Sequence, residues 1–185
     1  MVSNATGGTH ADPEGIRRKV EILIRNFEKE LRDGELRQKV LAIIPIFRTL
    51  RTLGKSLIPV EYASAARDRI LYYFRRYPRL TIHGDELLVV SGIQEYARRV
   101  RELRVQFGWA IASGMTIKEM LADEADDHGE GLTDIKPNEY VLLHDEEDRD
   151  AAHRWNLANT IRKKRAAVRD KILEYFRMNV GRNIT

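Results

Sequence analysis

The sequence predicts a mainly α-helical protein with a small β-hairpin. Apolar side chains recur every three or four residues over most of the chain, which is the period of an amphipathic helix. Residues 109–113 alternate like a strand, and a polar, acidic stretch separates them from a second strand at 139–143. A segment that begins at Arg67 also returns later in the chain, which indicates an internal repeat.

Composition limits the possible functions. The 185 residues can form one ordinary domain or two small ones, and a hydrophobic fraction of 43 % supports a packed core. The net charge is only +4, so the distribution of charge says more about nucleic-acid binding than its total does. The chain has no cysteine, which excludes disulfides, thiolate zinc sites and a cysteine nucleophile. It has no secretory signal and no apolar run near the roughly 20 residues that span a bilayer, so we expect a cytoplasmic protein without membrane contact.

Residues 1–60 are expected to hold a flexible N-terminus and an antiparallel helical pair. Asp12-Pro13-Glu14 supplies an N-cap, a first-turn proline and an early acid, and Asp33-Gly34 ends that helix. A second helix is predicted from Leu36 to Leu53, with Gly54 as its stop. Pro45 lies inside it and should kink it or split it in two. The pair provides either packing support or a dimer surface, so a homodimer is an open option.

Residues 61–145 carry a more informative order of elements. A helix is predicted over 63–77, followed by a short extended piece at 80–82. His83 and Glu86 have the spacing of a capping box, which starts a short helix that breaks at Ser91-Gly92. The next helix is predicted over 93–107, Gly108 stops it, and the two strands follow. Helix, short strand, helix, tight turn, helix and hairpin is the order of a winged helix-turn-helix domain.

The repeat concerns the first helix of this domain. Arg67–Arg75 (RDRILYYFR) returns as Arg169–Arg177 (RDKILEYFR), at an offset of 169 − 67 = 102 residues. The offset still holds where Ile82 meets Ile184, and His83 then matches Thr185. A shared amphipathic pattern could imitate part of this match, but we expect an internal duplication. Residues 146–185 would then be a linker helix and the start of a second, truncated copy of the winged-helix unit.

The helix over 93–107 holds the main candidate binding residues. Its predicted buried stripe is Ile93, Ala97, Val100, Leu103 and Phe107. Its candidate DNA-binding residues are Gln94, Arg98 and Arg101 on another face, Glu95 and Arg99 beside them, and Arg104 further on. In the predicted fold this helix enters the major groove, where arginine can donate two hydrogen bonds to guanine and Gln94 can pair with adenine. The alternative is a solvated helix face with Glu95 and Arg99 as an ordinary ion pair.

The other charged residues give weaker indications of function. Arg75, Arg76, Arg79 and the basic run 162–165 are candidates for phosphate contacts, or they simply keep the surface soluble. The acidic stretch 123–130 could bind a divalent metal, but we expect a solvated loop without fixed geometry. The histidines lack metal-site spacing, and no phosphate-binding loop or nucleophile motif occurs. The sequence therefore predicts no catalytic residue, no cofactor and no metal.

Part of the chain resembles a known group of enzymes. Residues 91–104 (SGIQEYARRVRELR), followed by Phe107–Ile111, resemble a module of bacterial restriction-type endonucleases, closest to the front part of HNH-type nucleases. In those enzymes two winged-helix units precede a zinc-containing nuclease domain. Residues 154–162 of this chain are similar to the helix that connects the two units. The resemblance covers roughly residues 40 to 185. It implies recognition of double-stranded DNA, with modified DNA as one option, in a defence system. This chain departs from the family because it has no HNH pattern and no cysteine pair, so any cleavage would belong to a parent protein.

Three functions remain open from the sequence. The first is a non-catalytic DNA-recognition domain that binds through Gln94, Arg98 and Arg101. The second is a protein-interaction or dimerisation module that uses the same fold. The third is a small nuclease that uses Asp126, Asp127 and Glu130 of the acidic stretch. The arginine-bearing helix favours the first function over the second, and the lack of a rigid acidic site disfavours the third.

Overall fold

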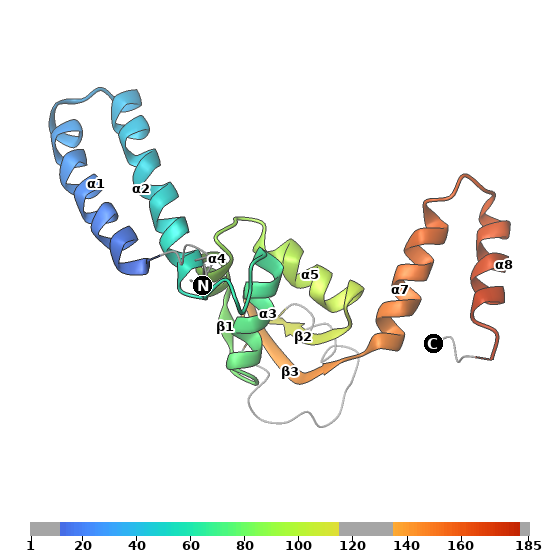
Figure 1. Cartoon of the computed structure of the whole chain (residues 1–185). Helices are drawn as coiled ribbons and strands as arrows, with labels where there is room; N and C mark the ends of the chain where they lie inside the picture. The colour runs from blue at the N-terminus through green and yellow to red at the C-terminus, as the bar shows by residue number, and fades with distance from the viewer. Residues whose placement is uncertain (1–11, 115–134, 182–185) are drawn as a thin grey trace, which may run out of the picture.

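The computed structural model describes residues 12–114 and 135–181 (Figure 1). A central unit of helices and a sheet carries one helical hairpin at each end, α1–α2 and α7–α8 (Figure 1). The helices are α1 (Pro13–Asp33), α2 (Leu36–Ser56), α3 (Ala66–Arg76), α4 (Gly84–Ser91), α5 (Tyr96–Gln106), α7 (Arg149–Arg162) and α8 (Val168–Met178). The strands are β1 (Ile82–His83), β2 (Trp109–Ser113) and β3 (Glu139–Glu147). The predicted fold class, mainly α-helical with a small antiparallel sheet, is confirmed.

The first hairpin begins as the sequence predicts. The Asp12 carboxylate accepts hydrogen bonds from the N–H groups of Glu14 at 3.1 Å and Gly15 at 3.0 Å, so it satisfies two N–H groups that have no partner inside the helix. Helix α1 ends at Asp33, also as predicted. Val20 of α1 and Ile46 of α2 are buried in the pair.

Helix α2 differs from its prediction at its C-terminal end. It is one helix from Leu36 to Ser56, so of the two outcomes predicted for Pro45, a kink or a split, the split does not occur. Pro45 deprives the Leu41 carbonyl of its helical partner, but both residues are exposed and water can satisfy that group. Gly54 does not end the helix either. A side chain there would begin 2.4 Å from the Val89 carbonyl oxygen, so Gly54 allows α2 to pack closely against α4.

The hydrophobic core joins α3, α4 and α5 to the sheet. Helix α3 begins at Ala66, three residues later than predicted, and buries Ile70 and Phe74 completely. These side chains belong to one cluster with residues of every other element of the central unit. The remaining members are Ile82, Leu87, Val100, Leu103, Trp109, Ile111 and Leu142. These nine side chains therefore form the main core of the central unit, and two smaller apolar clusters lie outside it.

The capping box of α4 forms as predicted. The Nδ1 atom of His83 accepts a hydrogen bond from the Asp85 N–H at 3.2 Å, and the Glu86 carboxylate accepts one from the His83 N–H at 2.9 Å. Glu86 also accepts a hydrogen bond from the Tyr73 hydroxyl at 2.6 Å, which ties α3 to the start of α4. At the other end Gly92 has a φ of 68°, the left-handed conformation that glycine adopts without strain.

The sheet has three antiparallel strands in the order β1-β3-β2. The predicted hairpin of β2 and β3 is present, and β3 runs four residues beyond its predicted end at Leu143. The third strand, β1, comes from the piece predicted only as extended, and it pairs Ile82 with Tyr140. The acidic stretch 123–130 lies outside the described residues.

The second hairpin contains the repeated segment. Helix α7 packs on α5, and the Asn156 side chain donates a hydrogen bond to the Gln106 carbonyl at 2.9 Å. Helices α3 and α8 begin and end at the same offset, since 168 − 66 = 102 and 178 − 76 = 102. Ile172 and Phe176 of α8 are 51 % and 53 % exposed, although their counterparts in α3 are buried. The duplication itself stays a prediction, and Thr185 lies outside the described residues.

Of the helices in residues 12–114 and 135–181, none is both long and apolar enough to cross a membrane.

Candidate nucleic-acid interface

The turn before α5 sets which residues this helix can present. Helix α5 begins at Tyr96, three residues later than predicted, because Ile93–Glu95 form a turn after Gly92. The Ser91 hydroxyl accepts a hydrogen bond from the Ile93 N–H at 3.3 Å within this turn. Gln94 is therefore an exposed turn residue and Glu95 is the N-cap, so the prediction that both lie within the helix is wrong.

The inner face of α5 packs on the central core. Val100 and Leu103 are buried as predicted, but Ala97 is exposed. Tyr96 takes the expected place of Ala97, because Tyr96, Val100, Leu103 and Phe107 also follow helical spacing and the tyrosine ring contributes more apolar surface. The buried stripe is thus shifted by one residue at its N-terminal end.

The outer face of α5 presents two arginines to solvent. The Arg98 side chain is 66 % exposed, and its ion pairs are loose, at 3.7 Å to Glu95 and 3.5 Å to Glu102. Exposed pairs of this kind contribute little and exchange readily with other partners. Arg101 is exposed and forms no ion pair with any other residue that the structure describes. Both guanidinium groups can therefore contact an anionic ligand.

The neighbouring arginines of α5 are held differently. The Arg99 guanidinium donates to both carboxylate oxygens of Glu102, at 2.8 and 2.6 Å, so Arg99 pairs with Glu102 rather than with Glu95. Arg104 is partly buried in a groove of about 340 Å³ between α5 and the sheet, which Arg101 and Tyr140 also line. Burial raises the pKa of the Tyr140 hydroxyl, while the positive charge of Arg104 opposes that rise. Arg104 thus faces the sheet more than the outside.

The second predicted basic group comes from α3 and from the turn that follows it. Arg75 donates a hydrogen bond to Asp145 of β3 at 2.7 Å, and its guanidinium lies 5.6 Å from the centre of the Trp109 ring. Arg76 is exposed and lines a separate groove together with Arg75. Arg79 is exposed in a turn with a φ of 62°, and its N–H donates to the Leu142 carbonyl at 3.0 Å. Asp145 neutralises Arg75, so Arg76 and Arg79 are the better candidates for phosphate contacts.

The described residues contain no metal site of three or more histidine and acidic side chains. Asp126, Asp127 and Glu130, the residues of the predicted nuclease alternative, fall in the part of the chain that is not described.

One comparison with known proteins concerns this central unit. Residues 67–143 match the family model of the KpnI N-terminal domain. The match begins in α3 and ends within β3, so it spans the helices and strands that share the core. It suggests a region like the N-terminal part of a restriction enzyme. No curated protein and no solved structure matches the chain.

Proposed function

We propose that residues 61–145 recognise double-stranded DNA on behalf of a restriction-type endonuclease, without cleaving it themselves. The observation that carries this proposal is that α5 has two different faces. Its inner face is buried against the core, while Arg98 and Arg101 are exposed to solvent. The match to a restriction-enzyme domain supports the same assignment. The resemblance of residues 91–111 to HNH-type enzymes makes that class the proposed parent.

In this proposal the central unit acts as a winged helix-turn-helix domain. Helix α4, the turn at Gly92 and helix α5 form the helix-turn-helix, and α5 enters the major groove. Arg98 and Arg101 would each donate two hydrogen bonds to a guanine, which discriminates against other bases by about 1–3 kcal/mol per contact. Gln94 precedes α5 in the turn and would contact an adjacent base or phosphate. Arg76 and Arg79 would add sequence-independent affinity.

The direct test is duplex binding at several salt concentrations, measured by fluorescence anisotropy. We expect binding whose logarithmic affinity falls linearly with the logarithm of salt, with a slope of about −0.9 for each neutralised phosphate. The same samples with magnesium or manganese should leave the duplex intact. An affinity that is absent at low salt, or insensitive to salt, would contradict the proposal.

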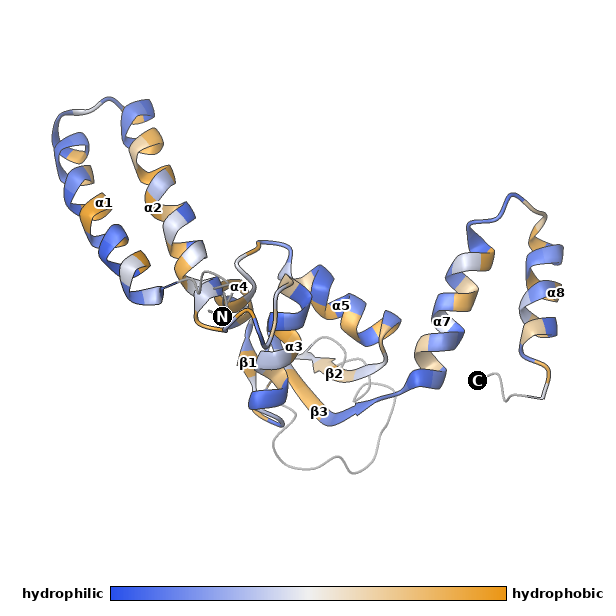
Figure 2. Cartoon of the chain, in the orientation of Figure 1, coloured by the Kyte–Doolittle hydropathy of each residue, from blue (hydrophilic) through white to orange (hydrophobic). Residues whose placement is uncertain are grey.

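A second candidate function, dimerisation, is favoured by the exposed surface of α2. Apolar residues follow each other along α2 at alternating spacings of four and three residues, the pattern of a helix–helix contact (Figure 2). They are Leu36, Val40, Ile43, Phe47 and Leu50, each between 46 % and 79 % exposed. Ile24 and Leu31 of α1 are exposed to a similar extent.

We propose a second copy of the chain as the partner on this surface. The seven side chains leave on the order of 600 Å² of apolar area, taking about 80 Å² for each, which approaches the ~800 Å² that each partner buries in a standard interface. Helix α2 carries five basic and no acidic residues, so two α2 helices side by side would repel each other. Helix α1 carries both signs of charge, and its acids Glu21 and Glu28 pair with Arg17 and Arg32 of the same helix. The arrangement with the least repulsion therefore has α2 of one copy against α1 of the other.

Replacing Ile43 by aspartate should abolish this dimer. Burial of an unpaired carboxylate in an apolar contact weakens association by about a hundredfold or more. Sedimentation equilibrium of the full chain would show a dimer for the wild type and a monomer for Ile43→Asp. Thr52→Asp, which adds the same charge to an exposed site on the same helix, should leave the dimer intact. A monomeric wild type at tens of micromolar protein would exclude this function.

A further inference from the structure

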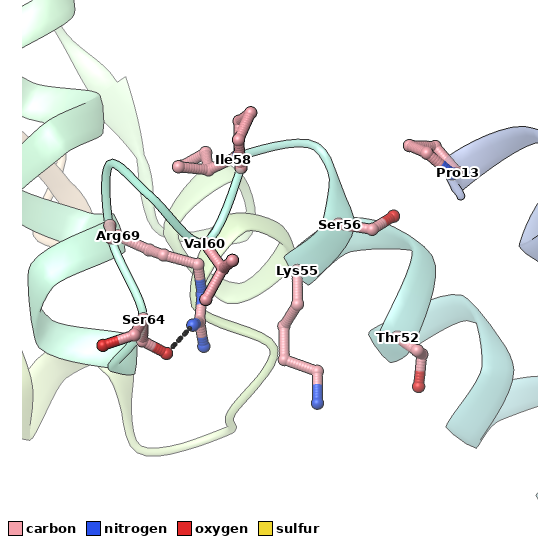
Figure 3. Close-up of a pocket in the computed structure, with 10 residues that line it drawn as sticks. Pro13, Thr52, Lys55, Ser56, Ile58, Val60, Ser64 and Arg69 are labelled. Atoms are coloured by element: carbon pink, nitrogen blue, oxygen red, sulfur yellow. Dashed lines mark hydrogen bonds between the residues drawn. The ribbon is translucent and has the colours of Figure 1, made fainter. Parts of the chain in front are cut away.

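A pocket with two cations lies between the end of α2 and the start of α3 (Figure 3). Its volume is about 420 Å³, and its polar side chains are Lys55, Arg69, Thr52, Ser56 and Ser64. The other lining residues are apolar, and no acidic residue lines it. The pocket is separate from the groove that Arg101 and Arg104 line.

Arg69 is a buried cation without a paired anion. It is 8 % exposed, and its guanidinium donates hydrogen bonds to three backbone carbonyls. These are Val90 at 2.9 Å, Ser64 at 2.6 Å and Ser91 at 2.8 Å. A guanidinium has five N–H groups, so two remain after these bonds. Arg69 forms no ion pair with any residue in 12–114 or 135–181, and burial lowers its pKa while the nearby Asp68 opposes that shift only in part. Since a buried charge is costly without a counter-charge, this position favours an anion.

Lys55 supplies the second charge from the end of α2 (Figure 3). Its side-chain stem covers Gly92, since a Cβ atom at Gly92 would lie 2.4 Å from the Lys55 Cγ atom. The stem of the Lys55 side chain therefore packs against the turn that leads into α5. Among the described residues it has no ion-pair partner.

We propose that this pocket binds a phosphate group, with Lys55 and the remaining N–H groups of Arg69 as its charged donors. Phosphate suits the site because several donors can share its oxygens and because its charge compensates both cations. The phosphate would come from the DNA backbone beside the major groove that α5 enters. This assignment rests on the proposed function. Two contacts place the pocket there: Arg69 binds the last two carbonyls of α4, and Lys55 packs on the turn that follows.

Arg69 was not among the residues predicted from the sequence, although the sequence contains a signal for it. Arg69 directly precedes Ile70 and lies one turn before Tyr73, so it falls on the inward face of an amphipathic helix. A charged residue at such a position needs hydrogen-bond partners or a ligand. Lys55 carries no comparable signal, because its neighbour Gly92 is 37 residues away in the sequence and the two meet only through the packing of α2 on α4.

The first test uses inorganic phosphate and the full chain. Nitrogen-15 NMR of arginine side chains should show a saturable shift of the Arg69 Nε–H signal with phosphate, and no such shift with chloride at equal ionic strength. Lys55→Ala should weaken phosphate about tenfold, because one charge-assisted donor is lost, and Lys55→Arg should retain most of the affinity. Arg48→Ala, which removes another exposed cation of α2, should change nothing. No saturable shift, or the same affinity in Lys55→Ala, would overturn the pocket.

The second test asks where the phosphate comes from. In duplex binding, Lys55→Ala should weaken all sequences about equally and reduce the salt slope by about one. If phosphate binds but the duplex affinity of Lys55→Ala is unchanged, the pocket stands and its ligand is a free phosphate compound. If the wild type binds no duplex at all, the proposed function fails, while the phosphate titration still decides the pocket.

Discussion

Phe74→Ala is expected to lower the free energy of unfolding by about 3–5 kcal/mol. The Phe74 ring is fully buried at the centre of the cluster that joins α3, α5 and the sheet. Its removal loses the transfer free energy of the ring and leaves a cavity that the surrounding helices cannot fill completely. A loss of this size is a large part of the total stability of a small domain. Urea denaturation followed by circular dichroism at 222 nm measures it directly.

The repeat offers a matched control for this substitution. Phe176 occupies the same place in α8 that Phe74 occupies in α3, at an offset of 102 residues, but it is 53 % exposed. Phe176→Ala should therefore change the free energy of unfolding by less than about 1 kcal/mol. Similar losses for both variants would mean that the apolar face of α8 is covered in solution, and a small loss for Phe74→Ala would contradict the packing of the central core.

The double variant Arg98→Ala/Arg101→Ala is expected to lower duplex affinity by about a hundredfold. Two bidentate contacts at about 1–3 kcal/mol each would allow a still larger loss, but neighbouring contacts are rarely additive. Both side chains are exposed, so the variant should keep the melting temperature of the wild type. Fluorescence anisotropy with a pool of duplexes of different sequence would measure the loss over many candidate targets at once.

Net charge requires its own control. Arg37→Ala/Arg48→Ala removes the same two positive charges from exposed positions of α2, away from α5. This variant should lower duplex affinity less than about threefold, because distant exposed charges are screened at physiological salt. Equal losses for the two double variants would show that the affinity reflects only overall charge. An unchanged affinity in Arg98→Ala/Arg101→Ala would remove α5 as the recognition element.

The sequence predicted best those features that depend on neighbouring residues. The N-cap at Asp12, the capping box of His83 and Glu86 and the glycine break at Gly92 each involve residues within four positions of one another. Some of the errors concern distant contacts. Helix α2 continues past Gly54 because that residue packs on Val89, and β1 is a strand only because Ile82 pairs with Tyr140, 58 positions later. Helical periodicity contains no information about such pairings.

The candidate site divides in the same way. The outward positions of Arg98 and Arg101 follow from the apolar spacing of Val100 and Leu103, so the sequence could place them. The ion-pair partners of Arg99 and Arg75 could not be predicted equally well. Arg99 pairs with Glu102 rather than with Glu95, the other acid within one helical turn, and Arg75 pairs with Asp145, which is 70 positions away in the sequence. The pairing of Arg69 with carbonyls of α4 likewise depends on tertiary packing.

The continuous helix α2 has a geometric consequence for target length. Its 21 residues extend over about 32 Å, and Pro45 does not divide them into two helices. One turn of duplex is about 34 Å long. Two copies that associate along these helices would hold their α5 helices at a distance set by folded helices and not by a flexible linker. The preferred targets would then be bipartite, with two short motifs whose centres are separated by a whole number of helical turns.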